Sequence, residues 1–410
     1  MMNKNMAANF LDQTTQLAMV GFVASLPVSI AFTQSSLFAG WVAWLLKCLV
    51  EKRWNGFKTP LDLGIGLFLA SALLSTVFSL SPWESFISLK KFYLLSAVYF
   101  TGFNVKSPAR LLELVKLFLG MTALTGVYGL VMFWFGYQPR LLAAQGMAMT
   151  SGGIFMMAGL LSLAWIQYQL GSPGRRQRLH SLAAAALLAA SLILTRTVSS
   201  WFGFVMGFPA LIRSWKRRTA VFLLAALLLA GVFYSANNYQ MSFKLYSGNK
   251  ATSWNMRLGF WRMGWQLIKE RPVLGTGSID LGQILKGMRT AEDEKLWQGI
   301  PMGGHLHNNF IQIAATRGFV GLAAFLFMWF SIFALAAKLM GSRSRLTGIF
   351  AGGIMAALTG FQINGLAEWN FSDSEVVTIV WVMAGLLLAL HRFNIDGILK
   401  DEPKKHEAVI

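Results

Sequence analysis

Long apolar runs alternate with short polar connections along most of the chain. Each run approaches the roughly 20 residues that a helix needs to cross a bilayer. The alternation predicts an all-α polytopic membrane protein with about twelve spanning helices, at residues 14–33, 36–50, 61–79, 86–103, 110–135, 150–170, 181–195, 199–213, 219–236, 319–337, 346–365 and 374–391. The first run has no convincing signal-peptide cleavage site, so we expect it to remain as the first span.

One connection, residues 237–318 between the ninth and tenth predicted spans, is long enough to fold into a subdomain. Within it, Trp254–Arg271 is predicted to form an amphipathic helix, because apolar side chains recur at spacings of three and four residues. The repeated residues are Leu258, Trp261, Trp265 and Ile268. Such a stripe is typical of a helix on the membrane surface, with tryptophan at the level of the headgroups. Pro272 ends this helix, and Gly275–Gly277 is predicted to form a turn.

The predicted elements divide the chain into four parts. These are spans one to nine at residues 1–236, the loop subdomain with amphipathic helices at 237–318, spans ten to twelve at 319–391, and a tail at 392–410. A mean hydropathy of +0.53 and a charged fraction of only 13% are typical of a membrane protein rather than a soluble domain. Composition and periodicity therefore predict the same class.

The formal net charge of +19 would suggest a nucleic-acid partner in a soluble protein. Here most basic residues lie in alternate short connections, which is the pattern of cytoplasmic membrane loops. The clusters are Lys52, Arg53 and Lys58; Lys106 and Arg110; Arg175, Arg176 and Arg178; Arg213 and Lys216–Arg218; Lys338, Arg343 and Arg345; and Arg392, Lys400, Lys404 and Lys405. The charge therefore indicates topology rather than nucleic-acid binding, with both termini in the cytoplasm and the 237–318 connection on the opposite, outer face.

The cysteine and histidine content restricts the chemistry. Cys48 is the single cysteine, which excludes an intramolecular disulfide and any site with several cysteine ligands. On the predicted outer face the sequence has no Asp-x-Asp pair and no histidine cluster with zinc spacing. We therefore expect a reaction that uses no metal and no other cofactor.

Two of the five histidines, His305 and His307, fall on the predicted outer face. Histidine has an ordinary pKa near roughly 6.5 and is suited to accept a proton at neutral pH. His307 begins an amphipathic segment that leads into the tenth predicted span, where polar side chains are costly without a use. His307 is therefore a candidate catalytic base, with a helix cap or an ordinary surface residue as the alternative.

Basic residues that lie on the outer face, against the charge bias of membrane loops, form the second group of candidates. They are Arg196, Arg257, Arg262, Lys90 and Lys91. Arg262 lies about 140° round the predicted helix from Arg257, so these two side chains cannot point the same way. Fixed cations suit an anionic substrate, because a guanidinium group binds phosphate oxygens in a planar fork and keeps its charge. A headgroup contact or a structural ion pair is the alternative for each.

The acidic candidates on this face are Glu368 and Asp373, with Asp280 and Glu270 in the long connection. Glu368 can pair with an arginine or orient His307. Asp373 precedes the last predicted span and can serve simply as an N-cap. His305 and Asn308 flank His307 closely in the sequence. We therefore treat His307, Arg257 and Arg196 as catalytic candidates, and the remaining residues as weaker candidates for binding substrate: Lys90, Lys91, Arg262, His305, Asn308 and Glu368.

Three motifs give the chain a resemblance to the O-antigen ligase and O-antigen polymerase superfamily of bacterial envelope glycosyltransferases. They are Leu194-Thr-Arg196 after an apolar helix, Arg257 with the later Glu270-Arg-Pro-Val-Leu-Gly-Thr-Gly277, and His307-Asn-Asn-Phe-Ile-Gln ahead of Gly318-Phe-Val-Gly321. The twelve-span layout with one long outer loop resembles the family as well. The chain reads Thr195-Arg196-Thr197 where the family more often has Ser-Arg-Gly, so the backbone there is an open question.

The resemblance implies a fold related to the C-type membrane glycosyltransferases. It implies an enzyme that moves a completed polysaccharide from undecaprenyl pyrophosphate to a sugar of the lipid A–core, inverting the anomeric carbon without metal or nucleotide. The site would face the periplasm from the bacterial inner membrane. Arg196, Arg257 and His307 match the family's functional positions, and Arg196 and Arg257 would hold the pyrophosphate while His307 activates the hydroxyl.

Other activities remain open from the sequence. A polymerase of the same superfamily would extend the glycan on its lipid carrier, and a protein-directed oligosaccharyltransferase is a third, less favoured enzyme. A transporter or flippase for lipid-linked glycans belongs to a different class. Transporters often contain an internal repeat and charged sites near the middle of the membrane. The polar outliers of this sequence gather at one interface, which favours an enzyme.

Overall fold

The computed structural model describes residues 4–52, 57–171, 174–212, 250–296 and 304–398. These residues are largely helical and contain no β-strand. The elements, in chain order, are α1 (Lys4–Ser25), α2 (Ile30–Glu51), α3 (Asp62–Val77), α4 (Pro82–Ser88), η1 (Leu89–Ser96), α5 (Ala97–Asn104), α6 (Pro108–Trp134), α7 (Ala148–Gln169), α8 (Arg175–Leu194), α9 (Val198–Gly207), η2 (Phe208–Leu211), α11 (Lys250–Glu270), α12 (Gly282–Gly287), α13 (Ala291–Leu296), α14 (Asn309–Met340), α15 (Arg345–Asn364), η3 (Asn370–Ser372) and α16 (Ser374–Ile395). The predicted all-α class is confirmed.

Six of the described helices are long and apolar enough to cross a membrane, namely α6, α7, α8, α14, α15 and α16. Two shorter apolar segments, Asp62–Val77 and Val198–Leu211, coincide with two further predicted spans. The helices α6, α7, α8, α15 and α16 also follow the predicted boundaries closely. The predicted span at 219–236 lies outside the described residues. The described part of the chain is therefore that of a polytopic membrane protein.

The first predicted span, 14–33, is wrong in its boundaries. Helix α1 already ends at Ser25, and the Ser29 hydroxyl accepts a hydrogen bond from the Phe32 amide to begin α2. Pro27 lies between the two helices. A proline followed by a serine N-cap breaks a helix inside an apolar run, and hydropathy alone does not detect that break.

The predicted span at 86–103 is also different in the structure. It consists of α4, the 3-10 segment η1 and α5 instead of one continuous helix. A 3-10 helix rises more per residue and presents its side chains differently from an α-helix. Lys90 and Lys91 lie in this 3-10 segment.

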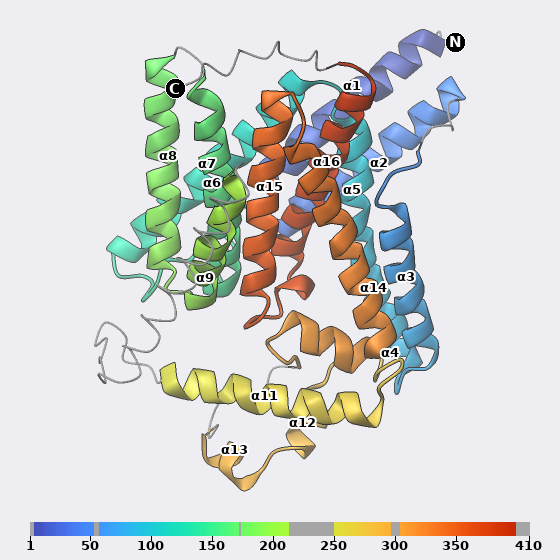
Figure 1. Cartoon of the computed structure of the whole chain (residues 1–410), viewed down its shortest axis with the longest axis vertical. Helices are drawn as coiled ribbons and strands as arrows, with labels where there is room; N and C mark the ends of the chain where they lie inside the picture. Colours follow the sequence, from blue (N-terminus) through green and yellow to red (C-terminus); the bar gives the residue numbers. More distant parts are fainter. Residues whose placement is uncertain (1–3, 53–56, 172–173, 213–249, 297–303, 399–410) are drawn as a thin grey trace, which may run out of the picture.

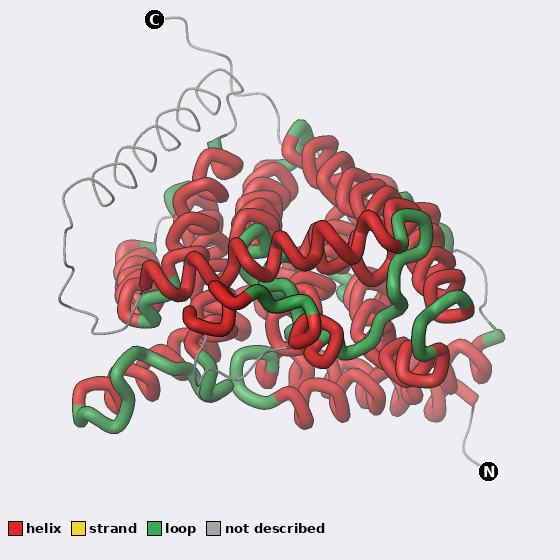
Figure 2. Tube along the Cα trace, turned by 90° about the horizontal axis from the view of Figure 1, so that it is seen from below, coloured by secondary structure: helices red, strands yellow, loops and turns green. Residues whose placement is uncertain are grey.

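The bundle helices run roughly alongside one another, and α11 lies across one end of the bundle (Figure 1). The view from that end shows a helix crossing the bundle ends (Figure 2). The described starts of α8 and α15 and the described ends of α14 and α16 lie at the other end. There Arg345 donates to the carbonyls of Gln167 and Tyr168, and Arg392 donates to the carbonyls that end α5. These arginines complement the negative ends of helices.

The layer formed by α11 has a small core of its own. Phe260, Met263 and Leu267 are buried on its inner face, against Leu306 and the first turns of α14. In the apolar stripe predicted for this helix, Leu258 and Trp265 are exposed and only Ile268 is fully buried. The predicted stripe is therefore not the packing face of α11.

Helix α14 is broken at Gly318, where φ is 64° and ψ is −172°. The loop after α11 supplies hydrogen bonds at the break. The Phe319 amide donates to the Pro272 carbonyl over 2.7 Å, and the Gly277 amide donates to the Thr316 carbonyl over 2.9 Å. Because these bonds replace those lost from the helix, the first turns of α14 can lie at an angle to the spanning part (Figure 1).

Replacing Gly318 with alanine should destabilise this junction. A Cβ atom there would lie 2.1 Å from the Val273 carbonyl oxygen, and the backbone conformation is one that only glycine adopts easily. We expect Gly318→Ala to lower the free energy of unfolding by about 1–3 kcal/mol, measured by thermal unfolding in detergent. Gly120→Ala is the matched control, because a Cβ on that exposed glycine of α6 meets nothing within 4 Å. Equal melting temperatures for the two variants would contradict the role of the break.

Candidate active site

His307 lies in the turn that leads into α14, and it has a positive φ of 48°. The next residue, Asn308, is the N-cap: its side-chain oxygen accepts from the amides of Phe310 and Ile311. The Asn308 amide nitrogen also donates to the Leu366 carbonyl over 2.8 Å. The Asn308 side chain is thus used for capping and for tying the turn to the segment after α15. Its predicted part in substrate binding stays a prediction.

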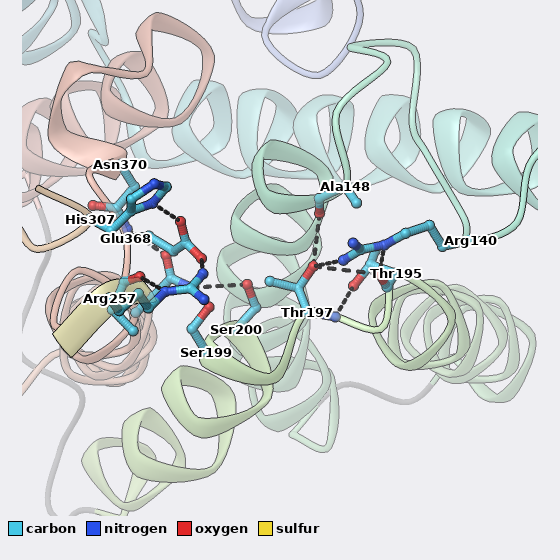
Figure 3. Close-up of polar contacts among 12 residues, drawn as sticks. Arg140, Ala148, Thr195, Thr197, Ser199, Ser200, Arg257, His307, Glu368 and Asn370 are labelled. Carbon is cyan, nitrogen blue, oxygen red and sulfur yellow. Dashed lines mark hydrogen bonds and ion pairs between the residues drawn. The ribbon is translucent and has the colours of Figure 1, made fainter. Parts of the chain in front are cut away.

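Glu368 lies between Arg257 of α11 and His307 (Figure 3). Its Oε1 atom is 2.5 Å from Arg257 Nη2, and its Oε2 atom is 3.5 Å from His307 Nδ1. The Glu368 side chain is only 7% exposed, and Arg257 also donates from Nε to the Ala367 carbonyl over 2.8 Å. Both contacts considered for Glu368 from the sequence are therefore present, with the arginine as the closer partner.

This arrangement suits acid–base chemistry. The 3.5 Å separation is an ion-pair distance, longer than an ordinary hydrogen bond. A carboxylate on the Nδ1 side of an imidazole stabilises the protonated ring and leaves Nε2 as the atom that can take a proton. Because Glu368 also holds Arg257, it connects the imidazole to a cation that can stabilise negative charge on a substrate.

His305 packs against His307, with ring centroids 4.3 Å apart. Burial lowers the pKa of His305, and the neighbouring His307 lowers it further. His305 is therefore uncharged at neutral pH. The two rings are inequivalent, because Glu368 lies at ion-pair distance from His307.

Arg196 lies in the turn between α8 and α9 and has a φ of 54°, the left-handed conformation. Its guanidinium group lies over the ring of Phe133 at 5.8 Å. Thr197 has a φ of −94°, which any residue adopts. A glycine is therefore not required at position 197, and the Thr-Arg-Thr sequence is compatible with the turn.

Arg140 holds this turn from the preceding outer connection (Figure 3). Its Nε atom donates to the Thr195 carbonyl over 2.9 Å, and Nη2 donates to the Thr197 hydroxyl over 3.2 Å. Arg140 was not among the residues predicted from the sequence. The signal was available, because Arg140 is an arginine in a predicted outer connection, as Arg196 is.

Three buried asparagines connect the Arg196 turn with the His307 turn. Asn309 donates to Asn370 over 2.7 Å, and Asn370 donates to Asn364 over 2.6 Å. Asn364 then donates to the hydroxyls of Ser199 and Ser200 at the start of α9. This amide chain fixes α9, α15 and the start of α14 to one another. Figure 3 shows Asn370 of this chain near His307 and Glu368.

The remaining candidates lie in two other places. Arg262 forms an ion pair with Asp293 of α13 and so stabilises the α11 layer away from His307. Lys90 and Lys91 line a cavity on the His305 side, where Lys91 Nζ donates to the Ser372 hydroxyl over 2.6 Å. The structure therefore brings together Arg257, Glu368 and His307, links the Arg196 turn to them through the amide chain, and separates Arg262 from them.

The fold and this site define a polytopic membrane protein with a histidine, a carboxylate and arginines at one end of its bundle. Residues 183–326, which include Arg196, Arg257 and His307, match a family model described as O-antigen ligase. A relative from Rickettsia conorii, provisionally named a polysaccharide ligase, is 23% identical over 339 residues, covering 78% of this chain and 76% of the relative. One from Rickettsia prowazekii with the same kind of name is 25% identical over 290 residues, covering 68% and 67%. The resemblance to the O-antigen ligase and polymerase superfamily is confirmed.

The support that Arg140 gives to the Arg196 turn can be tested directly. Arg140→Gln removes a charge-assisted donor to a backbone carbonyl, which typically contributes about 1.5–3 kcal/mol. We expect the amides of Thr195–Thr197 to exchange with deuterium roughly tenfold faster or more, measured by mass spectrometry. Arg176→Gln, on an exposed residue of α8, is the matched control. Unchanged exchange in Arg140→Gln would show that other contacts suffice to hold the turn.

Proposed function

We propose that this protein is an O-antigen ligase of the bacterial inner membrane. It transfers a polysaccharide from undecaprenyl pyrophosphate to a hydroxyl group of the lipid A–core, inverts the anomeric carbon and uses no metal. The end of the bundle covered by α11 faces the periplasm, and both termini face the cytoplasm. The match to the O-antigen ligase family and the basic side chains at the opposite end of the bundle support this orientation.

The observation that carries the proposal is the position of Glu368 between His307 and Arg257. A glycosyl donor that already has a pyrophosphate leaving group needs an aligned hydroxyl and stabilisation of the departing charge. The His307 imidazole, supported by Glu368, can align the hydroxyl. The guanidinium group of Arg257, held by the same carboxylate, can stabilise the departing charge.

In the proposed reaction, His307 Nε2 takes the proton of the acceptor hydroxyl as the hydroxyl oxygen attacks the anomeric carbon. A new carbon–oxygen bond forms on the face opposite the pyrophosphate. The bond between the anomeric carbon and the pyrophosphate oxygen breaks, and the pyrophosphate keeps the electron pair. Glu368 stabilises the imidazolium of His307 that results.

Arg257 and Arg196 are proposed to bind the pyrophosphate and the charge that develops on it. Arginine suits this role because its planar fork matches phosphate oxygens and stays charged. Glu368 holds Arg257 in place through Nη2, so the carboxylate acts as a positioning residue for both partners. The left-handed turn at Arg196 is held by Arg140 and by the amide chain.

Reconstitution gives the test. Purified protein is mixed with undecaprenyl-pyrophosphate glycan and lipid A–core without added metal, and transfer is followed by gel shift of the core. We expect His307→Ala to lower the transfer rate roughly 10²-fold or more, because it removes the general base. Glu368→Gln should also lower the rate, since it removes the negative charge shared by His307 and Arg257.

His180→Ala and Glu113→Gln provide matched controls, because both residues are exposed and lie away from this cluster. Both should retain wild-type transfer. Longer glycan that stays on undecaprenyl pyrophosphate would make the protein a polymerase. Movement of the lipid-linked glycan across the membrane with no covalent product would instead make it a transporter, and full transfer by His307→Ala would overturn the assigned base.

A further inference from the structure

A cavity of about 480 Å³ lies on the His305 side of the candidate active site. Its polar wall includes Lys90, Lys91, His305 and Arg317. Lys90 and Lys91 belong to η1, and His305 lies in the turn before α14. Arg317 is the residue just before the break in α14. His305 lines the cavity and also packs against His307. A group bound in the cavity is therefore next to the proposed catalytic base.

Arg317 is the unusual residue of this cavity. Its guanidinium group lies over two aromatic rings that also pack against each other, 4.8 Å from the centroid of Phe68 and 5.1 Å from that of Phe92. Its Nη1 atom is buried and has no hydrogen-bond partner among the described residues, and Nε has only a long 3.4 Å contact to the Ser278 hydroxyl. Among the same residues, Arg317 forms no ion pair. A partly buried guanidinium group whose Nη1 atom is buried and unbonded is costly unless it has an anion to bind.

Two carboxylates, Glu84 and Asp280, also line this cavity, and each keeps its negative charge while it accepts a backbone hydrogen bond. Glu84 accepts a hydrogen bond from the Asp280 amide over 2.6 Å, and Asp280 accepts one from the Gly282 amide over 2.7 Å. These contacts hold the outer loop against α4. Since His305 is uncharged at neutral pH, the positive charge of the cavity comes from Arg317 and the two lysines.

Another part of the wall is apolar and includes Trp369, Phe371, Trp381 and Leu94. Uncharged polar side chains such as Gln312 also line the cavity. A cavity that combines an unsatisfied guanidinium group and lysines with aromatic walls fits a phosphate group carried by an amphiphile. A free sugar would leave the buried charge unpaired.

We propose that Arg317 is a phosphate-binding residue, and that the cavity receives a phosphate of a phosphate-bearing glycolipid substrate. The inference rests on the proposed transfer reaction and adds a second anion subsite, in the cavity that His305 lines. Two substrates of that reaction contain such a phosphate: the pyrophosphate of the donor and the phosphates of the acceptor core. The chemistry of recognition is the same for both.

A binding measurement tests this without requiring catalysis. The full-length protein is placed in nanodiscs of zwitterionic phosphatidylcholine, and binding is counted by native mass spectrometry. The probes are undecaprenyl pyrophosphate, lipid A–core, and lipid A–core from which the phosphates have been removed. We expect Arg317→Gln to weaken binding of at least one phosphorylated probe roughly tenfold or more, because it removes a charge-assisted fork. Binding of the dephosphorylated probe should not change.

The different lipid probes show whether the bound phosphate belongs to the donor or to the acceptor. Weaker binding of undecaprenyl pyrophosphate alone assigns the subsite to the donor, and weaker binding of phosphorylated lipid A–core alone assigns it to the acceptor. Arg392→Gln is the matched control: Arg392 also lies over a phenylalanine ring, but its Nη1 donates to two carbonyls. Arg317→Lys keeps the positive charge but lacks the planar guanidinium group, so it should bind the phosphorylated probe with intermediate affinity. It also serves as the folded comparison if Arg317→Gln is unstable.

Wild-type affinity of Arg317→Gln for both phosphorylated probes overturns the proposal. The result is separable from the transfer assay. Loss of phosphate binding in Arg317→Gln with no transfer by the wild type would retain the subsite and reject the ligase activity. Transfer by the wild type with phosphate binding unaffected in Arg317→Gln would retain the ligase and reject the subsite.

Discussion

The geometry of the candidate active site depends on a chain of buried side-chain amides. Asn309, Asn370 and Asn364 bind one another in sequence, and Asn364 continues to Ser200 at the start of α9. Each buried amide left without its partner costs about 1–3 kcal/mol, and networks of this kind gain from being complete. The chain therefore fixes the Arg196 turn relative to the His307 turn, although these residues lie far apart in the sequence.

Both turns store backbone strain. Among the described residues, positive φ values outside glycine occur at Lys52, Arg196 and His307, so two of the three coincide with residues proposed to act in transfer. Such conformations cost about 1–3 kcal/mol each and persist only where the surroundings enforce them. Arg140 enforces the first by binding Thr195 and Thr197, and the Asn308 cap enforces the second. In these strained conformations, the side chains of Arg196 and His307 extend from turns and not from regular helices.

The sequence predicted the class of fold and three residues that lie together in the candidate site. His307, Arg257 and Glu368 were selected by topological side and chemical type, and the structure brings them together. The amide chain was not predictable, because hydropathy marks an asparagine as polar without showing which partner it binds, and Asn309 and Asn370 are 61 residues apart in the sequence. Arg317 was also missed, although it is an arginine in the predicted outer connection 237–318. Only its packing on Phe68 and Phe92 distinguishes it from the other basic residues there.

The break in α14 explains why two glycine-containing motifs occur together. Gly275 and Gly318 have positive φ, and a Cβ on either would meet the backbone of the other's segment at 2.4 Å or less. The two segments therefore pack backbone to backbone, which only glycine permits. Broken helices are tolerated near a membrane where the freed groups find partners, and here the partners come from the loop that follows α11. The two glycines thus allow the close backbone contact and the angle between the first turns of α14 and its spanning part. His307 precedes these first turns, and Arg317 lies at their other end.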